Sequence, residues 1–194
     1  MTMDKPSLTV ITNLALAIAG VAIGYVVDNM IVVPILFTIG IPLVNLDKHL
    51  KQKIGYTLLI IAGSLLIFLV AIIAIFRFSF DKYIFPGLLV ATAGLLLLLL
   101  NGLFIKSLHI NRRSMLFTFL LAGISFPIWT ALNDNVFPQA LADNDFFYQV
   151  GGMLLWMLLT TVGISTGIDH TNKHRSKAVS ETPFNSSRLH GQLS

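Results

Sequence analysis

Six long apolar runs, none of which contains Lys, Arg, Asp, Glu or His, constrain this 194-residue chain more than any other feature. The hydrocarbon core of a bilayer is about 30 Å thick, and a helix of about 20 residues crosses it. Backbone amides in lipid need partners inside the same structure, and these runs are continuous instead of alternating, so the pattern predicts helices. The runs are 8–27, 30–44, 54–76, 84–105, 115–132 and 146–168.

These runs predict an all-α fold, a polytopic transmembrane helix bundle with six spans. The connections between them are short, so neighbouring helices should pack antiparallel in one domain over residues 1–168. Residues 169–194 are rich in Ser, Thr, Asn and Lys and hold few large apolar side chains. We therefore predict a disordered tail there.

The small number of charges supports a membrane protein. Charged residues make up 11% of the chain, whereas a soluble domain carries about 25%. A soluble domain, a disordered chain and a basic nucleic-acid binder are therefore excluded. The chain has no cysteine, so disulfides, thiolate nucleophiles and Cys-ligated metals are excluded as well. The partner that this composition predicts is the lipid bilayer, and not a nucleic acid.

The first two runs leave two topologies open. Residues 8–44 are interrupted only by Asp28 and Asn29, and a straight helix of that length would measure about 55 Å, nearly twice the hydrocarbon core. Asp and Asn are good turn residues, so we predict a tight hairpin at this pair. The alternative is five spans, with 30–44 as a re-entrant segment.

The positions of the basic residues predict the orientation. With six spans, eleven Lys and Arg residues fall on the side of both termini and two fall on the other side. Because cytoplasmic segments carry an excess of Lys and Arg, we predict a multi-pass protein of the plasma or inner membrane with both termini and the tail cytoplasmic. The eleven residues are Lys5, Lys48, Lys51, Lys53, Lys106, Arg112, Arg113, Lys173, Arg175, Lys177 and Arg188.

Two of the predicted helices carry a stripe of small and polar residues at helical spacing. Glycines four residues apart let two helices approach closely, and a buried Asn or Thr can then form a hydrogen bond across the contact. We favour helix packing through Gly20, Gly24, Gly163 and Gly167. The alternative is a polar path lined by Asn13, Asp28, Trp156 and Thr160. The stripes are Asn13, Ala17, Gly20, Gly24 and Asp28, then Gly152, Trp156, Thr160, Gly163 and Gly167.

Prolines in the second and fifth runs give a separate indication of transport. Pro34 and Pro42 lie in 30–44, and Pro127 lies in 115–132, so each of these helices should be kinked or broken. If the six spans divide into two inverted halves of three, the prolines fall in the second span of each half. Interrupted spans at matching positions of inverted halves are typical of a transporter's central site.

Apparent enzyme motifs do not hold in this context. Residues 163–167 read Gly-Ile-Ser-Thr-Gly, which matches a serine-hydrolase motif that works on a turn between a strand and a helix, and here a helix is predicted. His170 and His174 have the spacing of a helical metal pair, but no further ligands are evident. We expect no enzyme activity, no cofactor and no metal.

The functional prediction is a small transporter or channel for an ion or small solute, and it is expected to be a homo-oligomer or to have a membrane-protein partner. The alternative is a non-catalytic subunit or an assembly factor of a larger membrane complex. In the transport interpretation the candidate pathway residues are Asn13, Asp28, Pro34, Pro42, Asn101, Pro127, Trp156 and Thr160.

Overall fold

The computed structural model describes residues 3–27, 29, 31–46, 50–78, 81, 83–138 and 145–168. This part of the chain is all-helical, as predicted, and carries a single isolated antiparallel bridge between Leu108 and Ile168. Two predictions lie outside the described residues: the turn residue Asp28 and the tail 169–194.

Four helices are long and apolar enough to cross a membrane: α1 (Lys5–Val26), α3 (Leu50–Phe78), α4 (Ile84–Phe104) and α5 (Arg112–Asn135). Two further apolar helices are α2 (Val32–Asn45) and α7 (Asp145–Ser165). The 14 residues of α2 give a helix of about 21 Å, which is shorter than the hydrocarbon core.

Capping residues, rather than the ends of the apolar runs, decide where α1 and α5 begin. The Asp4 carboxylate accepts a hydrogen bond from the Ser7 amide at 3.3 Å, and α1 starts at Lys5. The side chains of Asn111 and Ser114 form a reciprocal capping box, and α5 starts at Arg112. Both helices therefore begin three residues before their apolar runs, because the caps satisfy amides that would otherwise lack partners.

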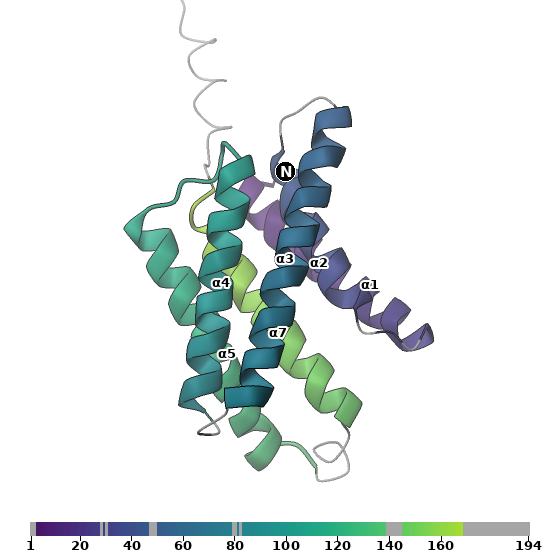
Figure 1. Cartoon of the computed structure of the whole chain (residues 1–194), viewed down its shortest axis with the longest axis vertical. Helices are drawn as coiled ribbons and strands as arrows, with labels where there is room; N and C mark the ends of the chain where they lie inside the picture. The colour runs from purple at the N-terminus through teal and green to yellow at the C-terminus, as the bar shows by residue number, and fades with distance from the viewer. Residues whose placement is uncertain are drawn as a thin grey trace, which may run out of the picture.

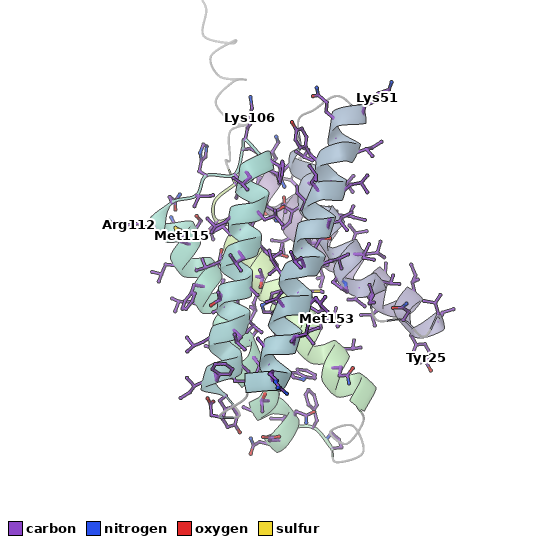
Figure 2. The ribbon with its side chains drawn as sticks, viewed as in Figure 1. Tyr25, Lys51, Lys106, Arg112, Met115 and Met153 are labelled. Carbon is purple, nitrogen blue, oxygen red and sulfur yellow. The ribbon has the colours of Figure 1, made fainter. Side chains whose placement is uncertain are left out.

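Each helix packs against its neighbours along the chain, and α7 also packs against α1, which closes the sequence of contacts into a ring. Figure 1 shows α3, α4, α5 and α7 in one bundle, which the α1–α2 hairpin crosses so that only its turn end projects away. Tyr25 marks the tip of this hairpin in Figure 2. Lys51, Lys106 and Arg112 all lie toward the same end of the bundle, which we call the basic end (Figure 2).

The α1–α2 hairpin is closely packed along its length. The backbone of Gly20 lies against Val33, Gly40 lies against Asn13, and the Asn45 side chain donates a hydrogen bond to the Thr9 hydroxyl at 2.9 Å. Residues farther along α2 thus pair with residues nearer the start of α1, in one antiparallel register. The chain therefore reverses between α1 and α2, at the place where the turn was predicted.

The prolines leave both helices unbroken. Pro34 lies in the first turn of α2, where a missing amide hydrogen costs little. Pro42 and Pro127 lie inside α2 and α5, and each helix continues past them. Each of these two prolines removes the helical partner of a carbonyl four residues earlier, on Thr38 and Gly123 respectively.

Candidate polar pathway in the bundle interior

Trp156 of α7 lies at the centre of the bundle. Its indole ring is 6.4 Å from the ring of Phe37 on α2 and 5.9 Å from the ring of Phe68 on α3, measured between centroids. Its Nε1–H donates a hydrogen bond to the backbone carbonyl of Val90 on α4 at 3.1 Å. One side chain therefore connects four helices, and it fills the middle of the bundle.

Asn13 joins α1, α2 and α7 close to this tryptophan. It is 1% exposed, and its Nδ2 donates to the Thr161 hydroxyl at 3.0 Å. The Thr161 hydroxyl in turn donates to the backbone carbonyl of Met157 at 2.9 Å. Asn13 Oδ1 lies against Gly40, where an added Cβ would come within 1.6 Å of it. Position 40 therefore has to be glycine if Asn13 is to keep this place.

Thr118 of α5 and Thr160 of α7 lie close together beside Gly94 of α4. Both side chains are fully buried, and both have their methyl groups within 4 Å of the position of a Cβ on Gly94. Gly163 lets α7 approach α5 here, since its Cβ would lie 2.5 Å from the Thr118 Cα. Helices α4, α5 and α7 thus pack closely together at this level of the bundle.

Nine buried side-chain oxygens have no hydrogen-bond partner among the described residues, and we call them the interior oxygens. Each of the six described helices contributes at least one. A buried polar group without a partner costs about 1–3 kcal/mol, so a dry interior of this kind is unfavourable. The interior oxygens belong to Asn13, Asn45, Ser64, Asn101, Ser107, Thr118, Thr130, Asn133 and Thr160.

The space beside Asn13 is small. A hollow of about 10 Å³ lies between α1, α2 and α7, and its polar lining comes from Asn13 and Thr161. This is the volume that one water molecule needs. The remaining lining is apolar, from Val10, Leu14, Ala17, Phe37, Leu154, Met157 and Leu158.

The candidate pathway residues do not all come together. Asn13, Trp156 and Thr160 lie around the inner face of α7. Pro34 and Pro42 are buried in α2, and Asn101 lies in the last turn of α4, where its Nδ2 donates to the Leu97 carbonyl at 2.8 Å.

Pro127 lies elsewhere. It lines an apolar groove on the outside of the α4–α5 pair and does not contribute to the interior near Trp156.

The four predicted packing glycines lie in α1, in α7 and just beyond the end of α7. Gly20 lies against the backbone of Val33, and Gly163 against that of Thr118. Gly167 lies against the carbonyl of His109, and Gly24 is buried. Three of these glycines thus contact helices or loops of the same chain.

Helix α5 carries a further polar stripe that was not predicted. Its buried residues include Ser114, Thr118, Ala122, Ser125, Trp129 and Asn133, which recur every three or four positions. The same spacing criterion that singled out α1 and α7 would have found it. Asn45 and Thr161 were also missed, because each makes its contact across a helix interface that the sequence does not reveal.

Among the described residues no group of three or more His, Asp and Glu side chains is placed to hold a metal ion. A scan of the chain against protein-family models, a search of curated proteins and a search of solved structures each found no match. The class of protein therefore follows only from the apolar helices and their polar interior. The chain is a helical membrane protein.

Proposed function

We propose that this protein is a small transporter or channel whose path runs between the helices that carry the interior oxygens. The observation that carries the proposal is that every described helix places at least one unpartnered oxygen inside the bundle. Polar atoms that serve packing alone would be expected to pair across helix contacts, as Asn13 does with Thr161. Interior oxygens without partners are suited to water or to a passing solute.

The chemistry of these atoms limits the solute. The interior oxygens are neutral, and four of them are amide oxygens, which accept hydrogen bonds and bind cations. An anion would find acceptors facing it. The proposed solute is therefore water, a small neutral molecule with hydroxyl or amine donors, or a cation that neutral oxygens can coordinate.

The closely packed interior fits a closed state of such a path. Trp156 fills the centre, and the hollow beside Asn13 has room for about one water molecule, about 10 Å³. Opening would require Trp156 to leave its contacts with Phe37, Phe68 and Val90. We propose this side chain as the gate and the basic end as the cytoplasmic side.

Flux into proteoliposomes tests the proposal. Thr160→Val removes an interior oxygen with little change of volume, and Trp156→Phe shortens the central side chain. Thr160→Val is expected to lower the flux of a permeant solute severalfold, and Trp156→Phe to raise it. Thr92→Val is the matched control, because Thr92 is exposed on α4 and its hydroxyl bonds to the Leu88 carbonyl. Absence of flux for water, glycerol, ammonium, Na⁺ and K⁺ would refute transport.

The second candidate is a subunit of a larger membrane complex. The observation that favours it is the exposure of α3. Only 11% of the most apolar window of this helix is buried. In that case flux is absent and native mass spectrometry from membranes gives a defined assembly that contains other chains.

A further inference from the structure

The lipid-facing side of the α4–α5 pair is hollowed by an apolar groove of about 440 Å³. The groove is separate from the interior oxygens, so a ligand bound in it requires no transport activity. Its lining residues include the buried Gly87 and Ala91, the half-buried Gly123, and the exposed Leu88, Leu120 and Ile124.

Small residues create the floor of the groove. A Cβ on Gly87 would lie 3.0 Å from the carbonyl oxygen of Gly123, and a Cβ on Gly123 would lie 3.1 Å from the Cβ of Ala91. The two helices therefore touch almost backbone to backbone. The exposed side chains of Leu88, Leu120 and Ile124 form the walls, and each is 50% exposed or more.

The length of the groove matches one leaflet. It extends from Tyr83 to Ala91 along α4 and from Phe119 to Pro127 along α5, which is about 12 Å of helix in each case. One leaflet contributes about 15 Å of hydrocarbon. A transmembrane helix crosses about twice that length, so the groove suits a single acyl chain better than a partner helix.

A polar pair of side chains extends beyond one end of the groove, which Tyr83 lines. The Tyr83 hydroxyl donates a hydrogen bond to the Asp134 carboxylate at 3.3 Å, and both residues are exposed. They lie where α4 begins and α5 ends, opposite the basic end. Tyrosine is typical of the membrane interface, so this pair marks the level of the headgroups. A carboxylate there attracts a headgroup that carries an ammonium group. It repels a headgroup whose phosphate has no positive group beside it.

We infer that the groove binds one phosphatidylethanolamine molecule, with an acyl chain on the glycine floor and the ammonium group beside Asp134. The apolar walls hold the chain, and the carboxylate selects the headgroup. An anionic lipid such as phosphatidylglycerol has the same chains but no ammonium group, so the two lipids separate the contributions of groove and headgroup.

Native mass spectrometry of the delipidated full chain tests this inference. With equal amounts of both lipids, the protein is expected to retain one phosphatidylethanolamine with a preference of up to about fivefold, the upper range for an exposed ion pair. Leu120→Trp and Ile124→Trp place a large ring over the groove, and each is expected to remove the bound lipid. Leu66→Trp on α3 is the control, because Leu66 is 62% exposed and lies outside the groove.

The two parts of the inference fail separately. Asp134→Asn is expected to keep one lipid bound but to abolish the preference for phosphatidylethanolamine. An unchanged preference would overturn the headgroup assignment. If both groove variants retain lipid as Leu66→Trp does, or if they change the oligomeric mass instead, the acyl-chain assignment is wrong. Circular dichroism of each variant identifies a folding failure, and either groove variant alone is sufficient for the test.

Discussion

Helices α3 and α7 make opposite use of their residues. The most apolar window of α3 has a mean hydropathy of 3.2, the highest of the four long helices, yet 11% of it is buried. α7 carries Trp156, Thr160 and Gly163 on its inner face, and all three are buried. The helix that looks most like a protein core is thus the one that is most exposed.

The difference between α3 and α7 follows from the bilayer, which is the solvent of a membrane protein. Lipid tails are as apolar as leucine, so burying leucine against protein gains little hydrophobic free energy in a bilayer. Small residues that allow close approach, and polar residues that need partners, gain more from contact with protein. In this chain, hydropathy therefore identifies the surface, and the stripes of Gly, Thr and Asn identify the interior.

Trp156→Ala is the substitution with the largest expected effect. It removes the ring that connects α2, α3 and α4, and it should cost about 3–5 kcal/mol of stability, the range for a large aromatic truncated in a packed interior. Leu66→Ala on α3 is expected to cost under about 0.5 kcal/mol, since it changes a lipid-facing surface. Unfolding in mixed detergent and SDS measures both. Equal losses would contradict the contrast between α7 and α3.

Glycine-to-leucine substitutions test the same contrast between α7 and α3, because they show where a neighbouring helix lies close to the glycine. A Cβ at Gly163 would lie 2.5 Å from a backbone atom of α5, so Gly163→Leu should cost about 1–3 kcal/mol or more through overpacking. A Cβ at Gly55 on α3 meets nothing within 4 Å, and Gly55→Leu should leave stability unchanged or raise it slightly. Thermal aggregation of the detergent-solubilised variants gives the ranking, and a destabilised Gly55→Leu would argue that α3 has a partner.

A smaller effect is expected at the hydrogen bond between α1 and α7. Thr161→Val leaves Asn13 Nδ2 without its acceptor, and interhelical hydrogen bonds in membranes are worth about 0.6 kcal/mol on average and up to about 1.7. Thr92→Val on the exposed side of α4 is the matched control. A double-mutant cycle with Asn13→Ala isolates the pair, and a coupling energy of zero would show that this contact does not stabilise the closed ring.

The smallest effect is expected at Asp81, which lies between the end of α3 and the start of α4. Desolvation acts to raise the pKa of Asp81, but hydrogen bonds from the amides of Tyr83, Phe85 and Ile84 hold it below its ordinary value of 3.8. A carboxyl whose pKa is lowered by folding stabilises the folded state at pH values above its ordinary pKa. This contribution is lost as the pH falls below about 4.

The first turn of α4 should therefore loosen in acid, and Asp81→Asn should weaken it at neutral pH. NMR titration of the three amides measures this change. A carboxyl that titrates at or above its ordinary pKa would contradict it.

The sequence predicts the helices well and their ends less well. Each apolar run corresponds to a helix, because backbone satisfaction in lipid leaves few other choices. The starts of α1 and α5 were missed by three residues each, since Asp4 and Asn111 are capping residues that hydropathy does not register. Hydropathy locates the membrane, whereas caps locate the helix termini.

The interior was only partly predictable. The stripe on α1 gave the correct buried face, since Asn13, Ala17, Gly20 and Gly24 are all buried. A threonine, however, can satisfy its hydroxyl on its own helix, as Thr92 does with Leu88. Thr92 and Thr118 therefore look alike in sequence, although one faces lipid and the other is fully buried. Only the packing of α5 against α7 distinguishes them.

The central place of α7 has a consequence for biosynthesis. It is the last described helix to leave the ribosome, although Asn13, Phe37, Phe68 and Val90 all depend on it for a contact. Chains are made at about 5–20 residues per second, so the amide group of Asn13 waits at least about seven seconds for Thr161. During that interval the N-terminal hairpin must persist on its own contacts, in the translocon or in lipid. The hydrogen bond from Asn45 to Thr9 lies within the hairpin, so it can form before α7 is made.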